Sequence, residues 1–235
     1  MAHRRNIFLL LGQSNMAGRG DLNDVPAIAD DRIEMFRNHE WLKAHEPLHQ
    51  DNKHIAGIGA GMSFAQKLIT HDLNIKIGLL PCAKGWTSIS DWMPGTPLYS
   101  NALSITKEAM LQGELKGILW HQGENDTFNF PDALAYGDRL TKIILGLRND
   151  LNIQDLPFIS GELGYFLSHL KEFECVAQVN HHLNDLKNSI KNYGCINAKG
   201  LKPKSDKIHF DSKSLRTMGM RFAQEYLNQK SIGEL

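Results

Sequence analysis

A serine placed to act as a nucleophile follows the first apolar run of the chain. The run Ile7–Leu11 predicts a buried strand, and Gly12 ends it two residues before Ser14. A strand that turns into a helix here puts Ser14 at the carboxyl edge of a sheet, where open α/β sheets bind ligands. Backbone N–H groups at a helix start lack partners and hold anions, so this hydroxyl suits acyl transfer. The alternative is that Ser14 only caps the helix.

A base and an orienting carboxylate for such a nucleophile stand near the other end of the chain. Asp206 precedes His209 by three residues, ahead of a predicted closing helix. In a turn, that separation lets the carboxylate accept from Nδ1–H and leaves Nε2 to take a proton. The pattern alone is also typical of surface turns, and Asp211 is a second carboxylate that could orient His209.

Two further strand ends carry small or polar residues. Cys82–Ser88 follows a predicted strand at Lys76–Pro81, and Gln122–Asp126 follows one at Gly117–His121. Because the carboxyl ends of parallel strands share one edge of a sheet, we expect both segments to converge on Ser14. They would supply glycine and side-chain amides, which are the donors that an oxyanion hole requires.

Strand-like and helix-like runs alternate along the chain, which predicts a parallel sheet with helices on both faces. The expected strands are Ile7–Leu11, Arg32–Phe36, Lys76–Pro81, Gly117–His121, Pro157–Ser160 and a short one at Cys195–Ala198. The expected helices are Gly61–His71, Ser100–Leu111, Pro131–Leu147, Glu174–Lys191 and Ser212–Leu227. We expect a single domain over 1–235, built as a three-layer α/β/α sandwich with about five parallel strands. The polar stretch Asn38–Ile58 has no clear period, which indicates a functional loop or a structure that the sequence does not reveal.

The composition excludes several classes of function. The 235 residues include 26 basic and 26 acidic ones, so there is no electrostatic footprint for nucleic acid or an acidic membrane. The first apolar run is shorter than the roughly 7–15 residues of a signal-peptide core, and no run approaches the length of a membrane span. Three widely spaced cysteines, Cys82, Cys175 and Cys195, indicate reduced thiols. We therefore expect a cytoplasmic protein; its oligomeric state stays open.

Four blocks together resemble the SGNH hydrolase superfamily and, within it, carbohydrate esterase family 6, the acetylxylan esterases and sialate O-acetylesterase-like proteins. The resemblance runs from Ile7 to about Ala223. Its blocks are Gly12-Gln13-Ser14-Asn15-Met16, Pro81-Cys82-Ala83-Lys84-Gly85 with Thr87-Ser88-Ile89 and Trp92, Trp120-His121-Gln122-Gly123-Glu124-Asn125-Asp126, and Asp206-Lys207-Ile208-His209. The resemblance implies a flavodoxin-like SGNH hydrolase fold and a Ser-His-Asp esterase that needs no metal or cofactor.

The resemblance also implies roles for individual residues. Ser14 would attack the ester carbonyl, His209 would move the proton, and Asp206 would hold the imidazole. The oxyanion would lie between the amides of Ser14 and Gly85 and one side-chain amide.

The identity of that side-chain donor stays open. The superfamily pattern Gly-x-Asn-Asp nominates Asn125, whereas the family pattern Gln-Gly-Glu-Ser-Asp nominates Gln122. Trp86 stands where the family often has a second glycine, which leaves open which main-chain amide donates. The candidates for substrate contacts are Gln13, Trp86, Trp92 and Glu124.

The function expected from these residues is hydrolysis of O-acetyl esters on a carbohydrate, such as an acetylated xylo-oligosaccharide or O-acetyl sialic acid, through an acyl-serine. The alternatives are a short-chain lipid or thioester esterase of the same superfamily and a non-catalytic sugar-binding module. Glu124 and Asp126 also suggest a glycosidase pair, but their i, i+2 spacing need not make them face each other. Gly57–Gly61 departs from the phosphate-loop pattern, and no histidines have zinc-site spacing.

Overall fold

The computed structural model describes residues 4–233 and contains a seven-stranded sheet in the order β3-β2-β4-β1-β5-β6-β7. Its strands are β1 (Arg5–Gly12), β2 (Ile33–Arg37), β3 (Glu40–Lys43), β4 (Ile77–Pro81), β5 (Gly113–His121), β6 (Phe158–Gly161) and β7 (Tyr193–Ile196). All neighbours pair in parallel except β3, which runs antiparallel to β2. The α/β/α prediction is confirmed, while the expected count of about five strands is too low.

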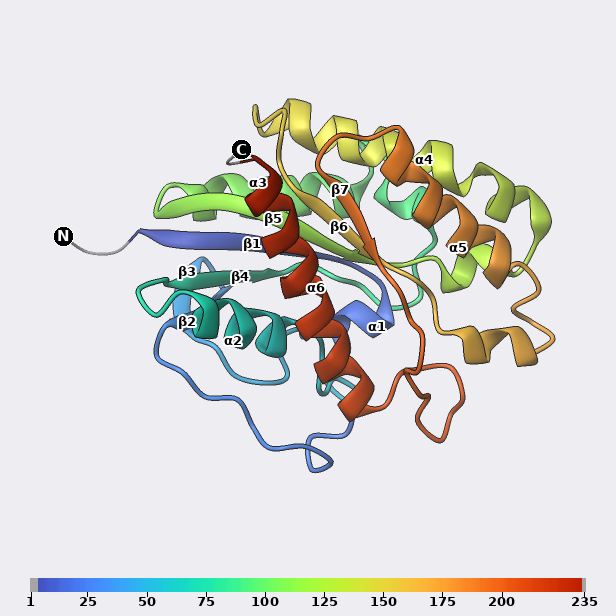
Figure 1. The fold of residues 1–235 in the computed structure, drawn as a ribbon, viewed down its shortest axis with the longest axis horizontal. Coiled ribbons are helices and arrows are strands. Elements are labelled where there is room, and N and C mark those ends of the chain that lie inside the picture. The colour runs from blue at the N-terminus through green and yellow to red at the C-terminus, as the bar shows by residue number, and fades with distance from the viewer. Residues whose placement is uncertain (1–3, 234–235) are drawn as a thin grey trace.

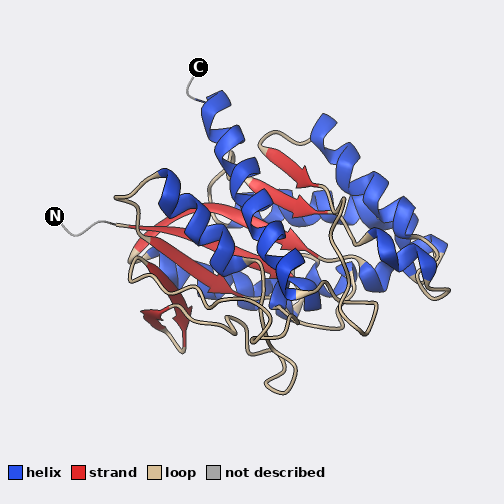
Figure 2. Cartoon of the chain, turned by 60° about the horizontal axis from the view of Figure 1, so that its bottom comes forward, coloured by secondary structure: helices blue, strands red, loops and turns tan. Residues whose placement is uncertain are grey.

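Helices lie on both sides of this sheet (Figures 1 and 2). They are α1 (Ser14–Ala17), α2 (Gly61–His71), α3 (Pro97–Met110), α4 (Phe130–Asp150), α5 (Val176–Asp185) and α6 (Ser212–Gly233). Short 3₁₀ turns lie at Ile89–Trp92, Glu124–Thr127, Tyr165–His169 and Leu186–Asn188. The prediction for α2 matches at both ends. The expected helix Glu174–Lys191 is instead shorter and passes into a 3₁₀ turn.

The central strand β1 divides the apolar core into two layers. Ile7, Leu9 and Leu11 pack into the cluster that contains buried residues of α3, α4 and α5. Phe8 and Leu10 pack into the cluster on the opposite face, with residues of α2 and α6. Since side chains alternate along a strand, five consecutive apolar residues are what a strand covered on both faces requires.

The strand β3 was not expected, and its hairpin explains why. Only two residues, Asn38 and His39, connect it to β2, and both have positive φ values, of 52° and 65°. This is the geometry of a type I′ turn, which usually contains Asn-Gly. Because His39 occupies the position where glycine is usual, the sequence lacks the Asn-Gly pattern that would predict a hairpin. The strand β3 is also mostly exposed, so it has no buried apolar pattern. Part of the stretch Asn38–Ile58 is therefore an edge hairpin.

The order of the strands brings the predicted segments to one edge. β1 lies between β4 and β5, so the loops after these three strands are neighbours. Gly12 pairs with His121 at the end of β1 and has a φ of 134°. A Cβ at Gly12 would lie 2.0 Å from the His121 carbonyl oxygen, so only glycine permits this close approach. The chain then turns directly into α1.

Two predictions from composition concern the whole chain. Within residues 4–233, no helix combines the length and the apolar character needed to cross a membrane. The three cysteines are unpaired, as predicted. Burial raises the pKa of the Cys82 and Cys195 thiols to about 12, so neither is a reactive thiolate at neutral pH.

Candidate active site

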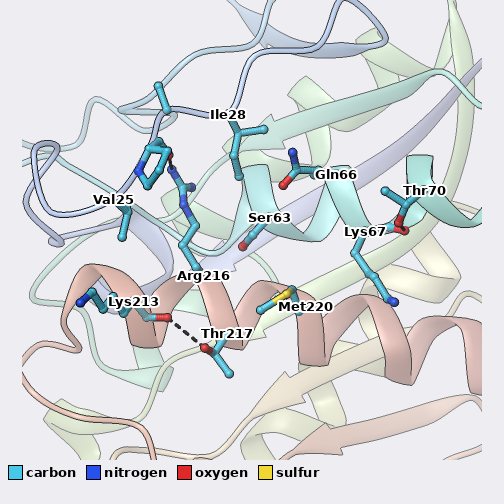
Figure 3. Close-up of a pocket in the computed structure, with 12 residues that line it drawn as sticks. Val25, Ile28, Ser63, Gln66, Lys67, Thr70, Lys213, Arg216, Thr217 and Met220 are labelled. Atoms are coloured by element: carbon cyan, nitrogen blue, oxygen red, sulfur yellow. Dashed lines mark hydrogen bonds between the residues drawn. The ribbon is translucent and has the colours of Figure 1, made fainter.

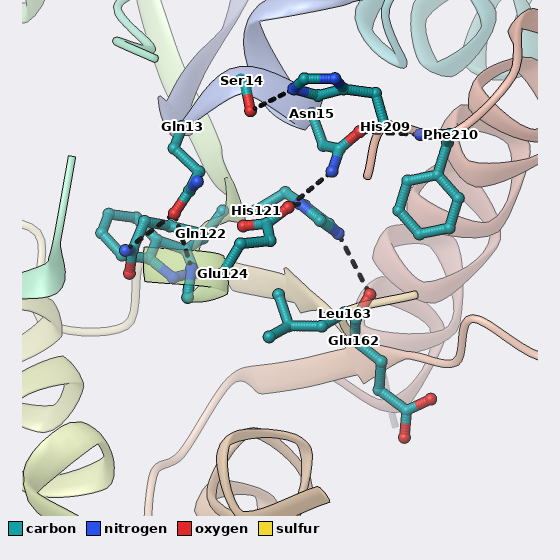
Figure 4. Close-up of polar contacts among 12 residues, drawn as sticks. Gln13, Ser14, Asn15, His121, Gln122, Glu124, Glu162, Leu163, His209 and Phe210 are labelled. Carbon is teal, nitrogen blue, oxygen red and sulfur yellow. Dashed lines mark hydrogen bonds and ion pairs between the residues drawn. The ribbon is translucent and has the colours of Figure 1, made fainter. Parts of the chain in front are cut away.

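Ser14, His209 and Asp206 form one hydrogen-bonded line at the carboxyl edge of the sheet. His209 Nε2 lies 2.9 Å from Ser14 Oγ, a contact visible in Figure 4, and His209 Nδ1 lies 2.9 Å from Asp206 Oδ2. An ionised carboxylate only accepts, so Nδ1 carries the proton and Nε2 is left to accept from the Ser14 hydroxyl. The structure therefore joins the two distant segments in the arrangement that a nucleophile and its base require.

The turn that carries Asp206 and His209 is held by the carboxylate itself. Asp206 Oδ1 accepts from the N–H groups of Ile208 and His209, both at 2.9 Å, and Lys207 has a φ of 63°. Burial favours the neutral acid, but these hydrogen bonds and the His209 ring outweigh it and lower the pKa of Asp206. Asp206 is therefore ionised at neutral pH and can stabilise a protonated imidazole.

A cavity of about 390 Å³ opens beside Ser14 and His209. Its lining residues are Gln13, Ser14, Trp86, Glu124, Asn125, Phe128, Leu170, Glu172, Phe173, Asp206, Ile208 and His209. Trp86 is 79% exposed and has a φ of 63°. A bulky residue at positive φ is strained, and strain of this kind gathers at functional sites. The predicted pocket role of Trp86 therefore agrees with its position.

A buried chain of hydrogen bonds joins the residue after the serine to the residue after the histidine (Figure 4). Asn15 donates from Nδ2 to Glu124 Oε1 at 2.6 Å, and its Oδ1 accepts from the Phe210 N–H at 3.0 Å. Glu124 Oε1 lies 3.7 Å from His121 Nδ1, and His121 Nε2 donates to the Glu162 carbonyl at 3.1 Å. The hydrogen bond between Asn15 and Phe210 therefore connects the segment that carries Ser14 to the segment that carries His209.

Gln122 was one of two candidates for the side-chain oxyanion donor, and that prediction is wrong. Gln122 is fully buried, and its Nε2 contacts Asp126 Oδ2 at 2.6 Å, the Thr87 carbonyl at 3.0 Å and Gln13 Oε1 at 3.1 Å. Its amide is committed to protein acceptors and does not line the cavity. Asn125 does line it. Because Gln13 Nε2 donates to Asn125 Oδ1 at 3.2 Å, the Nδ2 of Asn125 is the end left to donate.

The main-chain donor expected from Gly85 also points elsewhere. The Gly85 N–H donates to Asp51 Oδ2 at 2.8 Å, and Gly85 is not among the lining residues. The expectation that Gly85 faces an oxyanion is therefore not met in this arrangement. The Ser14 amide belongs to the first turn of α1, where N–H groups have no intrahelical acceptor.

Of the expected substrate contacts, Trp92 belongs to the interior, and Glu124 borders the cavity with a largely buried side chain. Trp92 is 1% exposed, donates from Nε1 to Thr87 Oγ1 at 3.0 Å and packs edge-on against Trp120, so its predicted contact with substrate is wrong. Glu124 borders the cavity, but its side chain is buried and bonded to Asn15. Gln13 lines the cavity and also accepts from the Gly123 N–H at 3.2 Å.

Sequence reasoning missed the apolar wall of the cavity. This wall contains Phe128, Leu170, Phe173 and Ile208, and the rings of Phe128 and Phe173 lie 5.2 Å apart. Ile208 lies inside the Asp206–His209 block, and Phe128 closely follows the block at Gln122. Proximity to the blocks could have found these two. Leu170 and Phe173 lie between the 3₁₀ turn at Tyr165–His169 and α5, where no motif marks them.

A larger cavity, of about 590 Å³, lies between α2 and α6 and lacks the chemistry of the first (Figure 3). Its hydroxyls include Ser63, which donates to the Ala60 carbonyl at 3.1 Å, and no histidine lines it. Among residues 4–233 there is also no group of three or more His, Cys, Asp or Glu side chains placed to hold a metal ion. The described residues therefore point to the smaller cavity as the candidate active site.

The sheet has the α/β/α architecture of the SGNH-like fold, and the Ser14–His209–Asp206 line and the cavity lie together at its carboxyl edge. Residues 4–228 match the model of the family described as carbohydrate esterase, sialic acid-specific acetylesterase. The chain therefore belongs to this family, as the four blocks predicted.

Individual relatives agree with this membership. The chain is 35% identical over 246 residues to the probable carbohydrate esterase At4g34215 of Arabidopsis thaliana, a match that covers 94% of this chain and 90% of the relative. The crystal structure of the At4g34215 protein superposes with a TM-score of 0.87 at 33% identity, covering 96% and 98% of the two chains.

More distant structures share the fold alone. NanS has a TM-score of 0.80 at 18% identity, with 97% of this chain and 98% of NanS covered. XAC1771, described as a carbohydrate acetylesterase from Xanthomonas citri, has a TM-score of 0.69 at 19% identity, with 94% and 55% covered. Family and fold together support carbohydrate esterase activity.

Proposed function

We propose that this protein is a serine esterase that removes O-acetyl groups from carbohydrates through an acyl-Ser14 intermediate. The observation that carries the proposal is the pair of 2.9 Å contacts that link Ser14 Oγ, the two ring nitrogens of His209, and Asp206. A serine hydroxyl is a weak nucleophile until a neighbouring base takes its proton. His209 supplies that base, and ionised Asp206 holds its tautomer.

The reaction then has two halves. Ser14 Oγ bonds to the ester carbonyl carbon while its proton passes to His209 Nε2. The tetrahedral intermediate expels the sugar alkoxide, which takes the proton from His209, and acetyl-Ser14 remains. Water attacks that ester with the same proton transfer, releasing acetate and restoring the hydroxyl of Ser14.

We propose the Ser14 N–H and Asn125 Nδ2 as the donors to the developing oxyanion. Both belong to residues that line the cavity, whereas the amides of Gly85 and Gln122 have acceptors within the protein. Donors of this kind are aimed at charge that exists only in the transition state, so they accelerate the chemical step.

The lining of the cavity supports a neutral sugar as the substrate. Trp86 and Phe128 present exposed aromatic rings, which offer flat apolar faces to a bound ligand. The described residues that line the cavity include the carboxylates of Glu172 and Asp206 and no lysine or arginine. The carboxylate of a sialic acid would meet like charge there, so we propose acetylated neutral sugars such as xylo-oligosaccharides over O-acetyl sialic acid.

The apolar wall also favours a second candidate, a short-chain lipid or thioester esterase. Hydrolysis of p-nitrophenyl acetate and of longer p-nitrophenyl esters separates the two. We expect acetate to be the preferred acyl group and Ser14→Ala to abolish turnover, with Ser90→Ala, an exposed serine, as the matched control. No turnover by the wild-type protein would favour a sugar-binding module, and a preference for long acyl chains would favour the lipid esterase.

Trp86→Ala tests the sugar contact separately. We expect KM for acetylated xylo-oligosaccharides to rise several-fold, about the effect of losing one aromatic contact worth ~1 kcal/mol, while p-nitrophenyl acetate is hydrolysed almost normally. Phe130→Ala removes an exposed ring outside the cavity and should change neither value. An unchanged KM in Trp86→Ala, or a higher kcat/KM for O-acetyl sialic acid than for the neutral sugars, would contradict this substrate class.

A further inference from the structure

The polar stretch 38–58 contains a buried carboxylate, Asp51, that lies next to the candidate active site. The Asp51 side chain is 4% exposed and forms a two-pronged ion pair with Arg19, whose side chain is 3% exposed. Arg19 Nη2 lies 2.6 Å from Asp51 Oδ2, and Nη1 lies 3.2 Å from Oδ1. Neither residue belongs to the Ser14–His209–Asp206 line, and neither lines the cavity. Ion pairs with this fork geometry fix orientation as well as charge.

This pair touches the two loops that bound the nucleophile. On one side, Arg19 Nη1 also donates to the Gly18 carbonyl at 2.9 Å, directly after α1, the helix that begins with Ser14. On the other side, Asp51 Oδ2 accepts the Gly85 N–H at 2.8 Å. A Cβ at Gly85 would lie 2.7 Å from Arg19 Nη2 and 3.8 Å from Ser14 Cβ. The Gly85 turn is therefore packed against both the pair and the serine.

The far side of the same turn is fixed by other contacts. Thr87 Oγ1 donates to the Lys84 carbonyl at 2.9 Å, and the Thr87 carbonyl accepts from Gln122. Trp86 lies between Gly85, which is bonded to Asp51, and Thr87. It has a positive φ and lines the cavity. On the Arg19 side of Trp86, the turn is held by the Gly85 N–H bond to Asp51 and by the Lys84 N–H bond to the Gly12 carbonyl at 2.9 Å.

Charge makes the arginine necessary to this arrangement. Burial favours the neutral form of Asp51, but hydrogen bonds from Arg19 and Gly85 outweigh it and lower its pKa. Asp51 is therefore an anion close to the place where the reaction would develop negative charge. The guanidinium of Arg19 neutralises it, so that the carboxylate can bind the Gly85 amide without opposing an oxyanion.

We propose that Arg19 and Asp51 are a positioning pair for the active site. Through the Gly85 N–H, the pair holds the Gly85–Trp86 turn against Ser14, and so fixes one wall of the cavity relative to the nucleophile. The proposal rests on the proposed esterase function. It assigns to Gly85 an anchoring role in place of the oxyanion contact that the family resemblance implies.

Two double variants differ only in whether residue 51 can accept the Gly85 N–H. Arg19→Met with Asp51→Asn removes both charges and keeps an acceptor, whereas Arg19→Met with Asp51→Leu removes the acceptor as well. Replacing both members of a buried pair avoids leaving one charge unpaired. We expect similar Tm values for the two, but a kcat/KM for p-nitrophenyl acetate about 10- to 100-fold lower in the Leu variant, since small misplacements at a reacting centre have effects of that size.

A control pair and a second readout separate positioning from folding. Arg216 and Glu46 form another largely buried ion pair that does not touch Gly85, and Arg216→Met with Glu46→Leu should keep normal kcat/KM. Hydrogen exchange of the Gly85 amide should be slow in the wild type and the Asn variant and fast in the Leu variant. Equal kcat/KM in the two Arg19 double variants, or equal exchange of Gly85, would overturn the proposal. If the wild type hydrolyses no acetyl ester, the esterase function fails, while the exchange comparison still decides whether Asp51 holds this amide.

Discussion

The two halves of the active site are built in opposite ways. The turn that carries the base and its carboxylate is partly exposed, with 20% of the His209 side chain and 37% of the Asp206 side chain accessible. The floor below the nucleophile, formed by Asn15, Gln122 and Glu124, is buried and densely hydrogen-bonded. In the mechanism that we propose, the turn supplies the groups that transfer protons, and the floor holds them in position.

The two halves meet at few points. One is the bond from the Phe210 N–H to Asn15, and another is the Ser14–His209 contact itself. Substitutions in the turn should therefore change the rate with little change in stability. Substitutions in the floor should change stability, and should affect the rate only through position.

The largest effect should come from replacing the carboxylate of the turn, Asp206. We expect Asp206→Asn to lower kcat for p-nitrophenyl acetate by about 10⁴-fold, because the amide favours the wrong tautomer of His209. The fold should persist, since the side chain is partly exposed. Asp211→Asn is the matched control: Asp211 accepts from the Ser214 N–H at the start of α6, and an asparagine keeps that oxygen acceptor, so Tm and kcat should both stay close to those of the wild type. A loss below tenfold in Asp206→Asn would mean that another group orients His209.

The next effect should come from Asn125, which lines the cavity above the floor and is the side chain that we propose as an oxyanion donor. Asn125→Ala should lower kcat by about 10²–10³-fold, the usual cost of one oxyanion donor, with little change in KM. Asn129→Ala serves as its control, because Asn129 caps α4 by accepting from the Asp132 N–H and lies outside the cavity. If kcat is kept in Asn125→Ala, the oxyanion must be held by other donors.

A smaller effect on the rate should follow when the hydrogen bond between Asn15 and the Phe210 N–H is removed. Asn15→Ala leaves the Glu124 carboxylate and the Phe210 N–H without their partner, which costs about 1–3 kcal/mol of unfolding free energy. We expect kcat to fall about tenfold as His209 loses its fixed position. Asn188→Ala removes an exposed asparagine and should change neither quantity. Normal kcat combined with lowered stability would show that this link supports the fold alone.

No effect on the chemical step is expected from Asp126, a buried carboxylate bonded to Gln122, which should act on stability alone. Burial raises the pKa of Asp126 to about 6, although hydrogen bonds from Gln122 and Ile89 oppose the shift. A raised folded-state pKa favours the protonated form, so the stability it contributes is full below about pH 4 and is lost as pH rises through 6. The free energy of unfolding of the wild type relative to Asp126→Asn should therefore fall by roughly 2 kcal/mol between pH 4 and 7. Parallel curves for the two proteins would contradict the raised pKa.

The sequence predicts the parts of this molecule that depend on periodicity and order. The apolar run of β1 is continuous and ends at a glycine, the stripe of α2 has a clear helical period, and three of the four blocks follow strands whose ends share an edge. The antiparallel edge strand β3 escapes prediction, because its turn lacks glycine and its face is exposed.

The direction of individual amides could not be predicted. Spacing places Gly85 and Gln122 near the nucleophile, but it does not say whether an N–H points to substrate or to a buried acceptor. That choice depends on Asp51 and Asp126, which supply the acceptors. The predicted substrate contact of Trp92 is wrong for a similar reason, because an aromatic side chain next to a motif can pack into the core as easily as it can face the cavity.

Covalent trapping of the nucleophile tests the central claim most directly. A fluorophosphonate reacts with a serine only where a base activates it, and peptide mass spectrometry then locates the adduct. We predict modification at Ser14 in the wild-type protein, in parallel with loss of p-nitrophenyl acetate hydrolysis, and no modification in a His209→Ala variant. An adduct on a different serine, or full loss of activity with Ser14 unmodified, would contradict the account.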